Sequence, residues 1–126
     1  MALGDHFVKE VRRLRALVGL ETGDMRAAWE GYGGLLKEGE HPDESFFYLA
    51  QIAMKQQRFD QALQLFARVQ EAPYLLPAQD AMSRIAEASG DTQSAMKLLN
   101  DLAQRRPRMA FDVARYRAAL LQRMGK

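Results

Sequence analysis

Apolar side chains recur along this chain in a spacing that is repeated three times. In each repeat an alanine is followed four residues later by a large side chain, and three residues after that by another apolar residue. The three sets are Ala28, Tyr32 and Leu35; Ala62, Phe66 and Val69; and Ala95, Leu99 and Leu102. Positions i, i+4 and i+7 lie on one face of an α-helix, so the pattern predicts a helix in each of the segments 23–42, 57–73 and 90–107.

Turn signals stand before each of these helices. Gly23-Asp24 and Gly90-Asp91 combine a glycine, which can take the left-handed conformation that ends a helix, with an aspartate that can cap the next helix. The middle repeat carries Gln57 at the glycine position. A proline closes each repeat, at Pro42, Pro73 and Pro107.

Helical stripes also precede each turn, over residues 5–22, 43–56 and 76–89, and the segment 109–124 has the same character. Asp43 is expected to cap the second of these helices, and Pro77 is tolerated in the first turn of the third. Because the turns are short, each stripe and the helix after it are expected to form an antiparallel hairpin.

A small residue stands seven positions before each turn. These residues are Ala16, Ala50, Ser83 and Ala118. Two helices approach to roughly 8–10 Å only where the side chains at their crossing are small, so these positions are expected at the crossings. The sequence therefore predicts an all-α fold of about seven helices in a single domain, residues 1–126, with repeats over 9–42, 43–75 and 76–108 and a terminal half-repeat over 109–126.

This arrangement resembles the tetratricopeptide repeat (TPR) family over nearly the whole chain. The family pattern places a small residue in the first helix, a turn residue, an alanine and an aromatic residue in the second helix, and a closing proline. In the middle repeat these are Ala50, Gln57, Ala62, Phe66 and Pro73. The resemblance implies a right-handed superhelix of antiparallel hairpins. Its style of divergence is similar to that of bacterial proteins with many such repeats. The pattern ends half-way through a repeat, so we expect either a segment of such a protein or a lone terminal helix that caps the repeats, as is also usual in this family.

The resemblance also implies a partner-binding groove, since the first helices of this family line a concave surface along which a partner peptide lies. Phe46 and Leu49 are expected in the core, whereas Phe47 and Met54 would form a second apolar stripe facing the groove. The alternative for Phe47 is packing under the adjacent first helix. The full set of expected groove residues is Arg13, Leu17, Leu20, Phe47, Gln51, Met54, Asp80, Arg84, Glu87, Arg115 and Ala119.

Three glycines, at positions 31, 33 and 34, fall inside one predicted helix. No Gly-Lys-Ser/Thr follows them and no strand precedes them, so a phosphate-binding loop is not indicated. Each glycine costs a helix about 1 kcal/mol relative to alanine. This helix is therefore expected to be the least stable one, or to pack unusually close to a neighbour.

Composition offers little for catalysis. The chain has no cysteine, its two histidines (His6 and His41) lie in different repeats, and no serine stands in a nucleophile motif. We therefore expect no enzymatic activity, no metal and no cofactor. No apolar run is long enough to span a membrane and the N-terminus lacks the apolar region of a signal peptide, while cytoplasmic and periplasmic locations both stay open.

Charge is uneven although the net charge is only +2. A cluster of basic residues near the C-terminus consists of Arg105, Arg106, Arg108, Arg115, Arg117, Arg123 and Lys126. It could contact nucleic-acid phosphates, or it could be a solvated helix face that pairs with acidic residues of a neighbouring repeat. No aromatic residues interleave with it as a base-stacking surface would need, which favours the second interpretation.

The leading functional prediction is a scaffold that binds a protein or peptide partner in the groove. The first alternative is a structural or self-association segment, in which a homo-oligomer forms through the last helix and its face of Phe111, Ala114, Ala118 and Leu121. The weaker alternative is nucleic-acid binding through the basic end.

Overall fold

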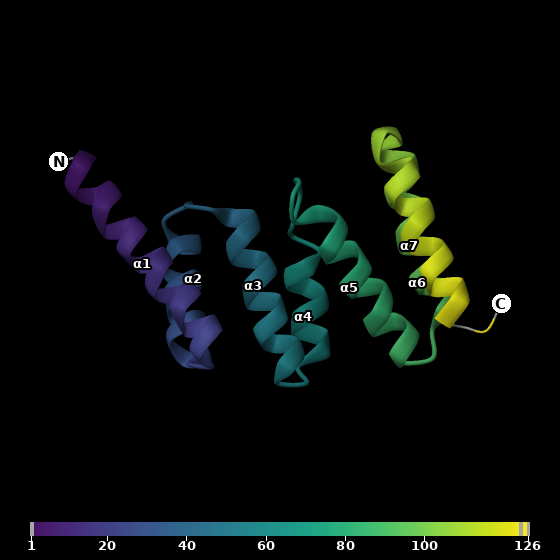
Figure 1. Ribbon diagram of the computed structural model, residues 1–126, viewed down its shortest axis with the longest axis horizontal. Coiled ribbons are helices and arrows are strands. Elements are labelled where there is room, and N and C mark those ends of the chain that lie inside the picture. Colours follow the sequence, from purple (N-terminus) through teal and green to yellow (C-terminus); the bar gives the residue numbers. More distant parts are fainter. Residues whose placement is uncertain (1, 124, 126) are drawn as a thin grey trace. The chain divides into compact units, whose positions relative to one another are not determined.

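A computed structural model describes residues 2–123 and 125 of the chain, and these residues form seven α-helices and no strand. The helices are α1 (Ala2–Thr22), α2 (Met25–Lys37), α3 (Pro42–Lys55), α4 (Phe59–Phe66), α5 (Leu75–Ala88), α6 (Thr92–Arg105) and α7 (Ala110–Arg123), with a short 3-10 turn over Pro107–Met109 (Figure 1). The all-α prediction is confirmed. Met1, Met124 and Lys126, the last of which belongs to the predicted basic cluster, lie outside the described residues.

The chain divides into two compact units. The first unit spans residues 1–69 and holds α1 to α4; the second spans residues 70–126 and holds α5 to α7. Within the first unit, α1 packs on α2, α2 on α3, and α3 on α4; within the second, α6 packs on both α5 and α7. The assignment of all 126 residues to one domain stays a prediction.

The turns between paired helices have the predicted left-handed residue. Gly23 and Gly90 have φ angles of 84° and 85°, and Gln57, at the matching position of the middle repeat, has a φ of 61°. The N–H of Gln57 donates to the carbonyl of Met54, and that of Arg58 donates to the carbonyl of Ala53. This pair of bonds closes a helix end by satisfying its last carbonyls. Gln57 therefore makes a glycine turn without the conformational freedom of glycine.

Two of the three predicted aspartate caps are present. A carboxylate oxygen of Asp24 accepts from the N–H of Ala27, and one of Asp91 accepts from the N–H of Ser94. Hydrogen bonds from the hydroxyl and the N–H of Ser94 hold the pKa of Asp91 below its ordinary value. Asp43 does not cap α3, because the helix begins one residue earlier, at Pro42, which places Asp43 inside the first turn.

The core of the first unit is built where α1 and α2 approach closely. Ala16 is fully buried, and a Cβ atom placed on Gly31 would lie 2.7 Å from the Cβ of Ala16. The larger side chains of Tyr32, Leu35 and Leu49 complete the buried cluster around this contact. Close packing of the glycine-containing helix, one of the two predicted outcomes, is confirmed at Gly31. A Cβ on Gly33 would meet nothing within 4 Å.

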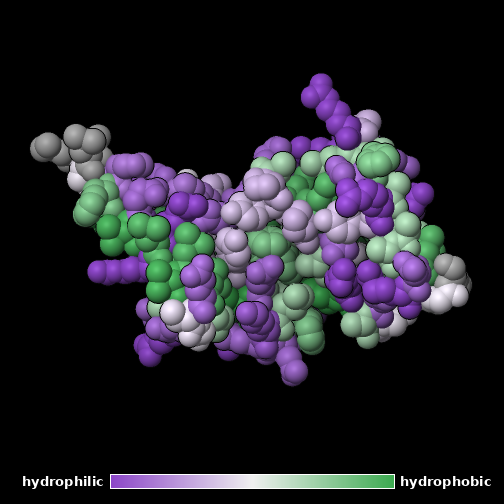
Figure 2. Space-filling model, viewed as in Figure 1, coloured by the Kyte–Doolittle hydropathy of each residue, from purple (hydrophilic) through white to green (hydrophobic). Residues whose placement is uncertain are grey.

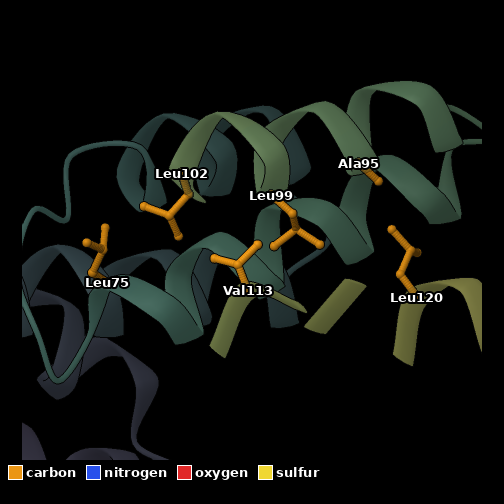
Figure 3. Close-up of a cluster of buried hydrophobic side chains, with 6 residues drawn as sticks. All are labelled: Leu75, Ala95, Leu99, Leu102, Val113 and Leu120. Carbon is orange, nitrogen blue, oxygen red and sulfur yellow. The ribbon is translucent and has the colours of Figure 1, made fainter. Parts of the chain in front are cut away.

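The core of the second unit is a cluster of aliphatic side chains from three helices. Leu75 comes from α5, Leu99 and Leu102 come from α6, and Val113 and Leu120 come from α7 (Figure 3). All five are at most 3% exposed, so α7 covers an apolar side of α6.

Among the predicted crossing residues, Ala16, Ala50 and Ser83 are fully buried, whereas Ala118 is exposed. The second helix of the middle repeat is also shorter than its apolar pattern predicts. The segment 57–73 was predicted to be helical, but α4 ends at Phe66. Val69 is nevertheless buried, from a turn in which its N–H donates to the carbonyl of Phe66.

Replacing Gln57 by glycine is expected to stabilise the protein. A residue other than glycine in the left-handed region costs about 1–2 kcal/mol, so glycine would relieve this strain in the folded state. Glycine also has more conformational freedom in the unfolded chain, which offsets about 0.5–1 kcal/mol of the stabilisation. Urea unfolding of Gln57→Gly should therefore show a free energy of unfolding that is higher by about 0.5–1 kcal/mol. Gln56→Gly is the control: Gln56 has a φ of −86°, so this change should destabilise. Equal effects of the two changes would contradict the interpretation.

Candidate functional site

Arg13, predicted to face the groove, instead joins α1 to α3 through an ion pair. Its Nε and Nη2 atoms donate to the two carboxylate oxygens of Glu44, at 2.8 Å and 2.9 Å. The Glu44 side chain is only 7% exposed and that of Arg13 is 29% exposed. A two-pronged contact of this kind is among the stronger polar contacts in proteins, and it fixes the two helices at a specific register. We therefore correct the assignment of Arg13 from a groove residue to a structural one.

Burial on its own would raise the pKa of Glu44, but the hydrogen bond and the charge of Arg13 outweigh it and hold the pKa below the ordinary value. The same carboxylate affects Tyr32, which is fully buried beside it: burial first, and then the negative charge of Glu44, raise the pKa of the Tyr32 hydroxyl well above its ordinary value. Glu44 is thus ionised and Tyr32 neutral over the whole neutral pH range.

Phe47 lies in the core and does not face a groove. Its ring contacts that of Phe66 edge to face, with 5.8 Å between the ring centroids, and the residue is 8% exposed. Phe46 is the more exposed neighbour, and the guanidinium of Arg68 lies 5.0 Å above its ring centroid. Of the two interpretations left open for Phe47, the groove is therefore wrong; Phe47 is packed, but against Phe66 of α4 and not under the adjacent first helix. Because α3 packs against both α2 and α4, its buried face is wider than the single stripe predicted from Phe46 and Leu49.

The other groove candidates of the first unit are partly covered. Leu17 and Leu20 pack against the buried cluster around Ala16. Gln51 and Met54 are half-buried on α3. In the first unit, then, these candidates either pack against the core or are half-buried on α3.

In the second unit, three of the five predicted groove residues lie together. Arg84 on α5 and Arg115 and Ala119 on α7 line a single open groove of about 480 Å³. The remaining lining residues are Pro73, Leu76, Pro77, Asp112 and Tyr116. The lining is therefore mainly apolar, with two guanidinium groups and the carboxylate of Asp112 among it. An apolar lining with a few polar groups is the usual composition of a ligand site. We call this hollow the α5/α7 groove.

Both arginines of the groove already touch a carboxylate of their own helix. The Nε of Arg84 lies 2.8 Å from Oδ2 of Asp80, and Nη1 of Arg115 lies 3.7 Å from Oδ1 of Asp112. The arginine side chains are 57% and 73% exposed, so these pairs contribute little to stability. A guanidinium has five N–H donors, and the ion pair of each arginine leaves most of its donors unused. Both arginines can therefore donate to a ligand in the groove.

Asp80 and Glu87, also predicted for the groove, act beside it. Asp80 orients Arg84, while Glu87 pairs with Arg123 of α7 at 3.1 Å. Tyr116, Asp112, Leu76 and the two prolines were missed by sequence reasoning. On α7 the signal was present: Asp112, Arg115, Tyr116 and Ala119 are spaced as one helical face, although only two of these four residues were selected.

Several arginines of the basic cluster near the C-terminus donate hydrogen bonds to other groups of the protein. Arg106 donates to Glu71 and to the carbonyl of Gln70, Arg117 donates to Asn100, and Arg123 donates to Glu87. Arg105 and Arg108 have no ion pair with any residue that the structure describes. The prediction that this face pairs with neighbouring acidic residues is confirmed for Arg106 and Arg123.

In residues 2–123 and 125 no group of histidine and acidic side chains could hold a metal ion. His41 instead lies 3.4 Å from a carboxylate oxygen of Glu10. No helix in the described part of the chain is both long and apolar enough to cross a membrane. No protein-family model matches this sequence, and no curated protein is significantly similar to it.

Removing Arg13 should destabilise the protein in a pH-dependent way. Arg13→Ala leaves the Glu44 carboxylate buried without its partner, and breaking such pairs costs about 3–5 kcal/mol; the partial exposure of Arg13 favours about 3 kcal/mol at pH 7. Because the pKa of Glu44 is lowered in the folded state, the stability due to the pair is present above the ordinary glutamate pKa of about 4.3 and is lost as the pH falls through the lowered value. Urea unfolding at pH 7 and pH 3 measures this.

The control is Arg26→Ala, because Arg26 forms an exposed pair with Glu30 within α2. This change should cost about 0.5 kcal/mol or less at either pH. A cost for Arg13→Ala that equals the control, or that is the same at pH 3 as at pH 7, would show that Glu44 does not depend on Arg13.

Proposed function

We propose that this chain is a tetratricopeptide-like interaction module that binds a peptide segment of a partner protein in the α5/α7 groove and acts by binding, without catalysis. The observation that carries the proposal is the joint placement of Arg84 and Arg115 around an apolar floor. Residues from two first helices of the repeat pattern meet there, which is the surface that the family resemblance implies for a partner.

The chemistry of the groove indicates the class of peptide. An apolar side chain would cover Leu76, Pro77 and Tyr116, and removing that surface from water favours binding by about 25 cal/mol per Å². A carboxylate next to it in the peptide would accept hydrogen bonds from Arg84 and Arg115, which present planar donors suited to carboxylates. We therefore propose a ligand segment that carries an acidic residue beside an apolar one.

A second candidate is self-association through α7. Its supporting observation is Phe111, which is 75% exposed, together with the exposed Ala114 and Ala118 on the same helix. Nucleic-acid binding has less support, because Arg106, Arg117 and Arg123 of the basic cluster are engaged with other side chains.

Selection from a random peptide library displayed on phage tests the groove. We expect the wild-type chain to select peptides with an acidic residue beside an apolar one. The double variant Arg84→Ala/Arg115→Ala should bind the selected peptides at least about ten-fold more weakly, which corresponds to about 1.4 kcal/mol. Its melting temperature should change little, because the two ion pairs that it removes are exposed.

Arg105→Ala/Arg108→Ala is the matched control, since it removes the same charge from residues outside the groove. It should retain the selected peptides at nearly wild-type affinity. Equal losses in the two double variants would mean that only net charge matters. Failure to select any peptide would also count against the proposal.

A further inference from the structure

A second surface, distant in sequence from the groove, is the outer face of α1. Phe7, Val8, Leu14 and Val18 are large apolar residues that are between 55% and 68% exposed. Figure 2 shows hydrophobic surface gathered over this helix, coloured green. Two open hollows of about 450 Å³ and 390 Å³ adjoin this face, and Val11 and Arg15 line both of them. A contiguous exposed apolar face of this kind marks an interaction site in soluble proteins.

The apolar residues of this face follow a heptad spacing. Phe7, Val11, Leu14 and Val18 are separated by four, three and four residues. In heptad notation Phe7 and Leu14 occupy d positions, and Val11 and Val18 occupy a positions. A β-branched residue at a combined with leucine at d is the combination that favours parallel two-stranded pairing. The spacing thus indicates another helix as the occupant, lying nearly parallel to α1.

Other residues of α1 contact the neighbouring helices. Ala16 packs on Gly31 of α2, and Arg13 pairs with Glu44 of α3. The basic residues Lys9 and Arg12 are likewise held by Glu40 and Glu38. Lys9, Arg12 and Arg13, cations that could flank a membrane-bound helix, are therefore already engaged with carboxylates of the same chain. The exception is Arg15, which has no ion pair with any residue that the structure describes.

Arg15 and Glu10 carry opposite charges beside the apolar face of α1, and these charges indicate which helix binds there. With Val11 at a, Glu10 is a g position and Arg15 is the following e position. In a parallel pair of helices the g residue of one chain faces the e residue five positions later in the other chain, and opposite charges there choose the partner. Glu10 of each copy would face Arg15 of the other, twice by symmetry. The Glu10 side chain is 35% exposed, and its contacts with Arg13 (3.7 Å) and His41 (3.4 Å) are long, so it can also reach a partner.

We propose that α1 pairs in parallel with α1 of a second copy of this chain, through Phe7, Val11, Leu14 and Val18. In an antiparallel pair Leu14 would face Val11, and Glu10 would lie near an apolar Leu17, so the charge complement would be lost. Two isolated helices of this length would pair weakly because they must first become helical. Here α1 is already held in helical form by its packing on α2 and by the Arg13–Glu44 pair with α3, which removes that cost.

Two experiments test the parallel dimer: sedimentation of the full chain over a range of concentrations, and disulfide cross-linking. The wild-type chain should show a reversible monomer–dimer equilibrium. Leu14→Glu should raise the dissociation constant at least about ten-fold. Because the chain has no cysteine, Leu14→Cys should form a disulfide-linked dimer under mild oxidation, since a parallel pair places the two copies of position 14 within disulfide distance. An antiparallel pair would instead link Leu14→Cys chains only to Val11→Cys chains.

Charge variants test the register. Arg15→Glu alone should weaken the dimer, and Glu10→Arg/Arg15→Glu should restore it, with melting curves confirming that each variant is folded. Phe111→Glu, at the exposed face of α7, is the control and should leave the dimer unchanged. The proposal is wrong if the wild-type chain stays monomeric at the highest attainable concentration, if Phe111→Glu dissolves a dimer that Leu14→Glu does not, or if the monomer binds lipid vesicles through Leu14.

Discussion

The packing of the helices in this protein depends on crossings where the residues are so small that the two backbones come close together. Ala16 and Gly31 illustrate the limit, because even a methyl group on Gly31 would come too close to the neighbouring helix. Ala50, Ala62, Ser83 and Ala95 are fully buried at comparable places in the other hairpins. Helices that approach this closely bring the larger residues beside them, such as Tyr32, into full burial. The stability of each hairpin therefore derives from small residues at a few positions and large ones around them.

This geometry also determines which polar groups become structural and which stay available. Glu44 is buried where α2 packs on both α1 and α3, so its partner Arg13 is needed for the fold. Between α5 and α7 an open groove remains, and Arg84 and Arg115 in its lining keep donors for a ligand. On α1 the face opposite Ala16 receives no cover, and its apolar residues remain exposed. Each surface that we propose as functional is one that the close helix contacts leave open.

The sequence predicted helices, turns and crossing residues well because all of these follow from local spacing. Ala16, Gly23 and Ala50 could be selected by periodicity alone, and even Gln57 could be placed in a glycine turn. The groove was predicted less well, because a residue one position along a helix is rotated by about 100°. That rotation separates Phe46 from the buried Phe47. The Arg13–Glu44 pair joins residues far apart in sequence, so no local pattern could reveal it.

The measurement that tests the central claim most directly compares two alanine substitutions within α2. Both Gly31→Ala and Gly33→Ala should gain about 1 kcal/mol from helix propensity. Only Gly31→Ala would force α1 and α2 apart, at a cost of about 1–3 kcal/mol for overpacking. Urea unfolding should therefore show that Gly33→Ala is more stable than the wild type and more stable than Gly31→Ala by about 1–3 kcal/mol. Equal stabilisation by both substitutions would contradict close packing of these helices.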